Sequence, residues 1–310
     1  MNSLVCPEIL KDGDKVVILS PSSKIDENLI IGEKKHLELW GLQVVVSPHA
    51  NGEYHSYSGT VEERLSDLQQ AMDDPAVRAI FCSRGGYGAV HLLEFLNFDK
   101  FNSSPKWLLG FSDISALHAL WQYHGYTSLH SFMARHLTLE PYDDPCTKDL
   151  HDFLFGKRMI DVNIPAEELN IKGSATGILR GGNLSVFYGL AATPYDIPEE
   201  NTILFIEDVG ERPYHIERMM YEIKLKGLLP KLKGLVVGQF TEYKKDDYIG
   251  KTVYQMIHDM VKPYGYPVCF NFPVGHVKNN RPLLMGGKFQ LDVNNKGVRL
   301  QQIIKERNDE

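Results

Sequence analysis

The sequence predicts an α/β protein in which a doubly wound, mostly parallel sheet is followed by a β-rich mixed α/β domain. Two observations lead to this prediction. Up to about residue 137, short apolar runs alternate with helix-like stretches, which is typical of a parallel sheet covered on both faces. Beyond about residue 175 the pattern is less regular and strands predominate. We therefore expect an N-terminal domain at 1–137, a linker region at 138–175 and a C-terminal domain at 176–310.

Four short apolar runs in the first half predict strands, because they are rich in β-branched or aromatic residues and end at turn residues. They are Lys15–Ser20, Leu42–Ser47, Val77–Cys82 and Trp107–Phe111. Helix-like stretches follow the strands at Glu27–Trp40, Val61–Met72 and Asp113–Tyr123, and an apolar helix is expected after the glycine-rich turn Ser83–Gly88. Ligands of such sheets bind at the carboxyl ends of the strands, where the turns at Ser83 and Ser112 lie.

The rest of the chain is less regular. The region from Thr138 to Ala175 is polar and turn-rich, and predicts one short helix at Lys148–Phe155. Further strands are expected at Ala175–Leu179, Thr202–Glu207, Gly234–Gly238 and Pro267–Asn271, with two more in Arg281–Leu300 around a turn at Asn294–Gly297. Helices are expected at His215–Lys226 and Lys251–Val261, and a short one after the glycine turn Arg180–Asn183.

Composition excludes several classes of protein. The 310 residues are 43% hydrophobic and 24% charged, which is enough for a large core. The net charge of −7 and the lack of a basic block disfavour nucleic acid as a partner. No apolar run approaches membrane-spanning length, and the N-terminus lacks the segments of a signal peptide. The four cysteines are scattered, so we expect reduced thiols in a cytoplasmic protein.

Ser112 lies where the apolar run Trp107–Phe111 meets the next helix. A serine at a sharp strand-to-helix turn is lifted out of the sheet beside the free N–H groups of the helix, as a nucleophile requires. Serine is also a favoured helix N-cap, and this simpler interpretation stays open.

A serine nucleophile needs a base and an orienting acid. His276 is a candidate base because it follows a strand in a loop bounded by glycine, asparagine and proline; otherwise it is an exposed loop histidine. Glu207 is a candidate acid because it closes an apolar strand, where burial of a carboxylate is costly unless it is paired. Asp208 and Glu211 are rivals, and any of the three could cap the following helix.

The turn SRGGYG at Ser83–Gly88 can present backbone N–H groups without side chains in the way. Together with the N–H of Asp113 it could form an oxyanion hole. The alternative is a phosphate cradle, although the turn lacks the Walker spacing and its lysine. Arg84 could bind a substrate carboxylate or be a surface arginine. Asn183 could point its amide into an interdomain cleft or cap a helix. No set of residues has the spacing of a metal site.

Six motifs, taken in order and spacing, resemble the LD-carboxypeptidase family of serine peptidases, which includes muropeptide LD-carboxypeptidases and microcin C self-immunity peptidases. They are SRGGYGA, LLGFSDIS, GGNLSVF, FIEDVGERPYHIERMMYEIK, GLVVGQF and GHVKNNRPLLMG. The resemblance runs from about Gly13 to Leu300. One difference from hydrolases with a GxSxG elbow is Ile114, which stands where that motif has its second glycine.

The resemblance implies a catalytic triad of Ser112, Glu207 and His276, with an oxyanion hole formed by the N–H groups of Gly86 and Asp113. It implies a flavodoxin-like or class I glutaminase-like N-terminal domain that carries the serine. It also implies a C-terminal domain of the swivelling β/β/α type that carries the acid and base, with the site between the two domains. A cytoplasmic homodimer without metal or cofactor is expected.

The activity implied is hydrolysis of the bond between an L-configured centre and the terminal D-alanine of cytoplasmic muropeptide tetrapeptides, in murein recycling. Two alternatives stay open: a self-immunity peptidase or amidase acting on a peptidyl-nucleotide, and a non-catalytic protein that binds a small ligand.

Overall fold

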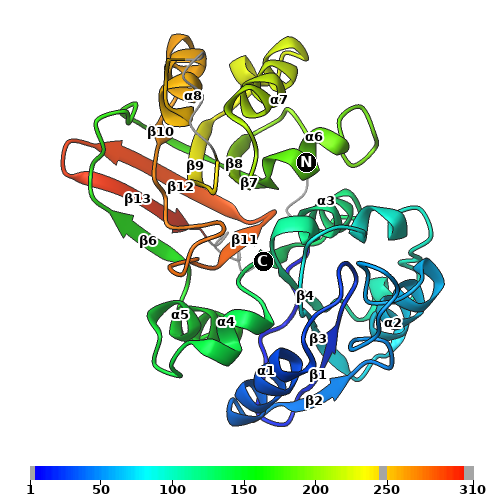
Figure 1. Ribbon diagram of the computed structural model, residues 1–310. Coiled ribbons are helices and arrows are strands. Elements are labelled where there is room, and N and C mark those ends of the chain that lie inside the picture. The colour runs from blue at the N-terminus through cyan, green and yellow to red at the C-terminus, as the bar shows by residue number, and fades with distance from the viewer. Residues whose placement is uncertain (1–3, 244–249, 304–310) are drawn as a thin grey trace. The chain divides into compact units, whose positions relative to one another are not determined.

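The computed structural model describes residues 4–243 and 250–303, which form two compact units (Figure 1). Unit 1 contains the described residues up to Arg158, together with Leu190–Asp196 and Lys278–Met285. Unit 2 contains Met159–Gly189, the described part of Ile197–Val277 and the described residues from Gly286 onward.

The sheet of unit 1 has the strand order β11-β5-β4-β3-β1-β2. Its strands are β1 (Lys15–Leu19), β2 (Gln43–Val46), β3 (Val77–Cys82), β4 (Trp107–Gly110), β5 (Ser128–His130) and β11 (Leu283–Met285). All neighbours are parallel except β11, which pairs antiparallel with β5. The order 2-1-3-4-5 of the parallel strands is that of flavodoxin-like proteins. Strands β3 and β4 are buried almost throughout, as expected of a sheet covered on both faces.

Helices lie on either side of these strands, with α1 and α2 flanking them in Figure 1. The unit contains α1 (Glu27–Leu39), α2 (Val61–Asp73), α3 (Ser115–Tyr123), α4 (Ala134–Leu139) and α5 (Pro145–Leu154), and the 3₁₀ turns η1 (Ala89–Leu92), η2 (Phe101–Ser103) and η3 (Ser112–Ile114). Side chains satisfy the first N–H groups of three of these helices: Asp26 caps α1, Thr60 with Glu63 forms a capping box on α2, and Asp144 caps α5.

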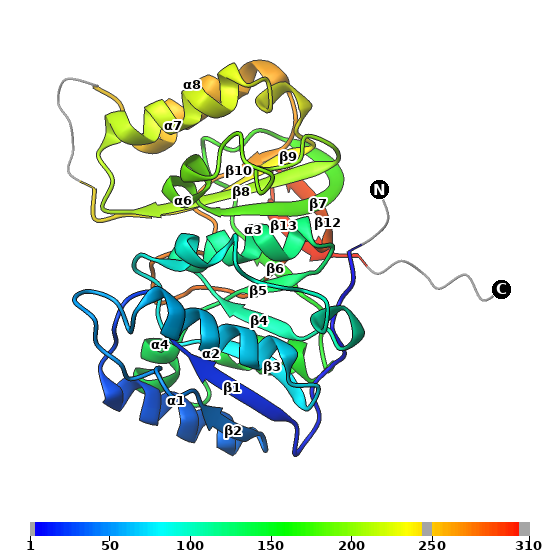
Figure 2. The same cartoon turned by 90° about the vertical axis from the view of Figure 1, so that its right-hand side faces the viewer.

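Unit 2 is built on a mixed sheet with the order β10-β9-β8-β7-β12-β13-β6. Its strands are β6 (Asp161–Ile164), β7 (Gly173–Asn183), β8 (Thr202–Val209), β9 (Gly234–Thr241), β10 (Val268–Cys269), β12 (Lys288–Asn294) and β13 (Gly297–Gln302). The first four strands in this order are parallel and the remaining pairs are antiparallel. The helical segments are α6 (Leu184–Gly189), α7 (Pro213–Leu225), α8 (Val253–Val261), η4 (Leu229–Lys231) and η5 (Lys262–Tyr264). Figure 2 shows α7 and α8 side by side along the parallel part of the sheet.

The predicted fold class is confirmed: one unit is doubly wound and the other is β-rich. The predicted division of the chain differs from the observed one. Residues 138–175 are not a separate linker, because α5 belongs to unit 1 whereas β6 and the start of β7 belong to unit 2. The polar composition of Asp161–Ile164 concealed a strand because β6 is an edge strand, only partly buried.

Further elements also differ from the prediction, among them α4, which was not predicted. The apolar helix expected after Gly88 is only the 3₁₀ turn η1, because the glycine-rich approach supplies no side-chain cap. Strands β5 and β11 were not predicted, since each has only three residues and neither has a periodicity of its own.

Among the residues that the structure describes, no helix combines the length and apolar character needed to cross a membrane.

Candidate functional site

Ser112 occupies the turn between β4 and α3 and has a left-handed backbone, with φ of +64°. Serine rarely adopts this conformation, which costs about 1–3 kcal/mol and persists only where the surroundings impose it. The N-cap positions of η3 and α3 are Phe111 and Ile114, and neither helix has a side-chain cap. The interpretation of Ser112 as a helix N-cap is therefore wrong, and the turn is a strained elbow.

His118 of α3 holds the strand end that precedes this elbow. Its Nε2 lies 2.9 Å from the carbonyl oxygen of Gly110, and its Nδ1 lies 2.8 Å from Ser128 Oγ. Burial lowers the pKa of His118 to about 4, so the ring is neutral at neutral pH. Because a carbonyl only accepts, Nε2 carries the proton and Nδ1 accepts from the Ser128 hydroxyl. This buried bond fixes the Gly110 carbonyl close to Ser112.

The predicted oxyanion groups lie in the same unit as Ser112. Gly85 approaches the elbow so closely that a Cβ there would be 3.0 Å from Ser112 Cβ and 3.2 Å from the backbone nitrogen of Asp113. Gly86 has φ of +102°, a conformation that favours glycine. The glycine turn is therefore packed directly against the backbone of the serine turn, as a shared oxyanion hole requires.

Glu207 and His276 form a hydrogen-bonded pair in unit 2. Nδ1 of His276 lies 2.7 Å from Oε2 of Glu207. The Glu207 side chain is fully buried and that of His276 is 20% exposed. Among the rival acids, Asp208 accepts bonds from the backbone N–H groups of Ser185 and Val209, and Glu211 pairs with His215. Of the three carboxylates considered, Glu207 is thus the one hydrogen-bonded to this histidine.

The electrostatics of the pair favour a protonated imidazole. Burial lowers the pKa of His276, but the hydrogen bond and charge of Glu207, helped by the charge of Asp208, outweigh burial and raise it above its ordinary value. Burial and the charge of Glu207 raise the pKa of Asp208 to about 6. An imidazolium stabilised in this way is what a general base needs after it has taken a proton.

Two features of the backbone make room for Glu207. The register of β8 against β9 shifts between Ile206 and Asp208, and such irregularities re-aim a side chain. Gly275 has φ of +126°, and a Cβ there would lie 3.0 Å from Oε2 of Glu207. Sequence reasoning missed this glycine, although its position directly before the candidate histidine was a usable signal.

The remaining predicted residues have structural partners. Asn183 is buried, donates to Oε1 of Glu207 at 3.2 Å and accepts from the N–H of Val186 in α6 at 3.3 Å. Its interpretation as a helix cap is therefore confirmed. Arg84 is exposed and donates to the carbonyl of Lys24 at 2.6 Å. Substrate binding by Asn183 or Arg84 stays a prediction.

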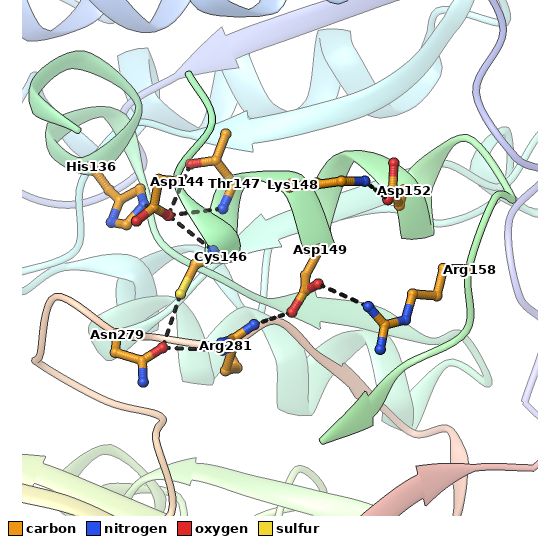
Figure 3. A network of polar contacts seen from close by, with 10 residues as sticks. All are labelled: His136, Asp144, Cys146, Thr147, Lys148, Asp149, Asp152, Arg158, Asn279 and Arg281. Carbon is orange, nitrogen blue, oxygen red and sulfur yellow. Dashed lines mark hydrogen bonds and ion pairs between the residues drawn. The ribbon is translucent and has the colours of Figure 1, made fainter. Parts of the chain in front are cut away.

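The chain that follows His276 is held to α5 within unit 1, as Figure 3 shows. The carboxylate of Asp149 pairs with Arg281 and lies 3.6 Å from Arg158. Sγ of Cys146 donates to the side-chain oxygen of Asn279 at 3.2 Å. The Asp149 carboxylate of α5 thus joins two segments that are distant in sequence. Neither Arg158 nor Arg281 was predicted as its partner.

Among residues 4–243 and 250–303, no group of three or more histidine, cysteine, aspartate or glutamate side chains is arranged to hold a metal ion.

Comparison with known proteins covers most of the chain. The family model described as LD-carboxypeptidase N-terminal domain matches residues 16–131, and that described as LD-carboxypeptidase C-terminal domain matches residues 176–291. A probable murein peptide carboxypeptidase of Bacillus subtilis is 30% identical over 97% of this chain and 95% of its own. The murein tetrapeptide carboxypeptidase of Pseudomonas aeruginosa is 30% identical over 86% of this chain and 89% of its own.

Solved structures agree with the fold. The muramoyltetrapeptide carboxypeptidase of Oxalobacter formigenes has a TM-score of 0.84 and 27% identity, covering 93% of this chain and 98% of its own. The microcin C7 self-immunity protein, in complex with aspartyl sulfamoyl adenosine, has a TM-score of 0.85 and 20% identity, covering 96% of this chain and 99% of its own. At that identity the second likeness concerns the fold alone.

Proposed function

Because the chain belongs to the LD-carboxypeptidase family, we propose that it is a serine LD-carboxypeptidase that removes the terminal D-alanine from muropeptide tetrapeptides. The observation that carries the proposal is the hydrogen bond between Glu207 and His276, in a chain whose Ser112 stands on a strained elbow. The substrate is proposed from the murein tetrapeptide carboxypeptidase and the muramoyltetrapeptide carboxypeptidase to which this chain is similar.

In the proposed mechanism, Ser112 Oγ attacks the carbonyl carbon of the scissile bond while His276 takes its proton. Nδ1 of His276 faces Glu207, which leaves Nε2 for the serine proton. Glu207 orients the imidazole and stabilises its charge. His276 then protonates the leaving amine of D-alanine, and water hydrolyses the acyl-enzyme with the same base.

The N–H groups of Gly86 and Asp113 are proposed to bind the oxyanion of the tetrahedral intermediate. The close packing of Gly85 against the serine turn supports this role. Arg84 is proposed to bind the terminal carboxylate of the peptide. The side-chain amide of Asn183, which lies next to Glu207, is also proposed to bind substrate. We propose that the protein is a homodimer that recycles murein peptides in the cytoplasm. Sedimentation checks the oligomeric state, and cell fractionation checks the location.

Incubation with disaccharide-free tetrapeptide, followed by mass spectrometry, tests the activity directly. We expect loss of one alanine, and a fall in turnover of about 10³- to 10⁶-fold in Ser112→Ala and His276→Ala. Ser103→Ala removes an exposed serine of the same unit and should turn over normally.

The outcomes separate the alternatives. A Ser112→Ala enzyme that keeps more than about a tenth of the activity contradicts the assignment of the nucleophile. Inert tetrapeptide with cleavage of a peptidyl-nucleotide points to the self-immunity type of activity. Binding of muropeptide without turnover, and without labelling by a fluorophosphonate, indicates a non-catalytic binding protein.

A further inference from the structure

Two buried side chains of opposite charge hold the turns next to Ser112. Arg64 of α2 is 2% exposed and Asp113 of η3 is 4% exposed. The proposed mechanism uses the backbone N–H of Asp113 but neither of these charges. Since burying a charge is costly unless it is paired and hydrogen-bonded, the contacts of both groups indicate what they do.

The two side chains bind opposite ends of one peptide group. Nη1 of Arg64 donates to the carbonyl oxygen of Gly88 at 2.9 Å. The N–H of Ala89, in the same peptide group, donates to Oδ2 of Asp113 at 2.8 Å. Because a peptide group is planar, bonds at both ends fix its orientation. The end of the glycine turn is thus clamped between a guanidinium and a carboxylate.

The same two atoms also hold the turn that follows β1. Nη1 of Arg64 donates to the carbonyl of Pro21 at 2.7 Å, and the hydroxyl of Ser22 donates to Oδ2 of Asp113 at 2.6 Å. A third bond, from Nε of Arg64 to the carbonyl of Gly59 at 3.1 Å, fixes the guanidinium itself. The pair therefore joins the ends of β1 and β3 to the serine turn.

The turn that follows β1 also orients Gly86. The N–H of Ser23 donates to the carbonyl of Gly85 at 3.2 Å, and the N–H of Tyr87 donates to Ser23 Oγ at 3.2 Å. The carbonyl of Gly85 and the N–H of Gly86 belong to one trans peptide group, so they point in opposite directions. The bond from Ser23 therefore sets the direction of the Gly86 N–H.

We propose that Arg64 and Asp113 are a positioning pair for acyl transfer: their side chains fix the turns that carry Ser112 and the Gly86 N–H. This inference rests on the proposed function, since it assumes that Ser112 is the nucleophile. Neither side chain is proposed to touch substrate.

Charge balance explains why the pair has both members. A buried carboxylate beside an oxyanion hole opposes the negative charge that develops there, and a buried guanidinium offsets it. Burial lowers the pKa of Arg64, whereas the charges of Tyr57 and Asp113 act to raise it, so the Asp113 carboxylate favours the charged guanidinium. Loss of one member leaves the other charge buried and uncompensated, so we expect the double variant to lose less activity than the sum of the two single losses.

The test measures how fast a fluorophosphonate phosphonylates the active-site serine of each protein, with loss of fluoride, together with kcat and KM on tetrapeptide. We expect Asp113→Asn and Arg64→Gln to be phosphonylated and to turn over at least about tenfold more slowly, with KM little changed, because small misplacements of catalytic groups are costly. Arg64→Lys, which keeps the charge, should recover part of the loss relative to Arg64→Gln.

Asp67→Asn is the matched control. Asp67 is also 4% exposed and accepts from Ser47 Oγ and the N–H of His49, at the end of β2. This variant should lose comparable stability yet be phosphonylated at a rate within about twofold of wild type, because the bonds of Asp67 do not reach the turns beside Ser112.

Normal phosphonylation of a folded Asp113→Asn protein overturns the proposal, and so does equal slowing in Asp67→Asn. If Asp113→Asn does not fold, Ser22→Ala, which removes one bond to the same oxygen, decides: slower phosphonylation supports the pair and an unchanged rate overturns it. Labelling that survives in Ser112→Ala contradicts instead the proposed function, so the two failures are distinguishable.

Discussion

Glu207 is the acid of the proposed triad, and its contacts define how it acts. It is fully buried, and its two oxygens are bonded to different partners, Asn183 and His276. A buried carboxylate held at both oxygens has a fixed orientation, so it can hold the imidazole in one orientation and tautomer.

The first prediction concerns replacement of this carboxylate by its amide. In Glu207→Gln we expect kcat to fall about 10³- to 10⁴-fold, because the imidazolium loses its counter-charge. The charge of Glu207 raises the pKa of His276 against burial, so its loss should lower that pKa and move the acidic limb of kcat/KM to lower pH. A pH–rate profile measures both effects. Glu211→Gln, at a rival acid, should leave the profile unchanged, and an unshifted limb in Glu207→Gln contradicts the proposed pairing.

A second prediction concerns Glu33 and the pH dependence of the protein's stability, and it is unrelated to catalysis. It is fully buried in α1, and neither of its carboxyl oxygens has a hydrogen-bond partner among the described residues. Burial raises its pKa well above the usual value, so the folded protein holds a proton that the unfolded chain releases above about pH 4.5. This contribution to stability is present at low pH and is lost as pH rises through the folded-state pKa.

Glu33→Met removes the titration. We expect the stability of this variant relative to wild type to increase with pH, by up to about 1.4 kcal/mol per pH unit, until the folded-state pKa is passed. Denaturant unfolding across pH 5–8 measures it. Glu38→Met, at an exposed position of the same helix, serves as the control, and an equal slope in both variants contradicts the prediction.

At the scale of elements, the site residues are presented by strand ends and the turns that follow them. Ser112 follows β4, the glycine turn follows β3, and Glu207 lies near the end of β8. Loops held by a rigid sheet are suited to function because the scaffold fixes them while solvent and ligands reach them. A substitution at Gly275 tests this arrangement, because Gly275 lies close to Glu207.

Gly275→Ala should displace the Glu207 carboxylate, because the added Cβ would meet it at 3.0 Å in a backbone conformation unsuited to alanine. We expect kcat to fall at least about tenfold. Gly265→Ala is the matched control, since Gly265 also has positive φ but nothing lies within 4 Å of its added Cβ. Kinetics and thermal unfolding of both variants distinguish crowding from backbone strain, and equal kcat in the two contradicts the prediction.

At the scale of the whole molecule, the proposed triad draws its serine from unit 1 and its acid and base from unit 2. All three roles are filled by protein side chains, so the proposed reaction proceeds without a metal. We expect treatment with EDTA, followed by its removal, to leave alanine release unchanged. Loss of activity that zinc or magnesium restores would contradict the proposed mechanism.

The sequence by itself determined the fold class and the set of candidate residues. Alternation of apolar runs with amphipathic stretches is a local property, so strands such as Val77–Cys82 and helices such as Val61–Asp73 were predictable within a few residues. The motif around Ser112 and the loop of His276 were also recognisable, because turn residues mark the ends of elements.

Only the tertiary structure decided which groups meet. Sequence reasoning put Glu207 first but left Asp208 and Glu211 as close rivals, and hydrogen bonds separate the three, because strand register and a local irregularity aim each carboxylate differently. Short strands such as β11, and the hydrogen bonds of Arg64 and Asp113 to the turns beside Ser112, could not be predicted from the sequence. Their energies come from partners distant in the chain, and no local pattern encodes those contacts.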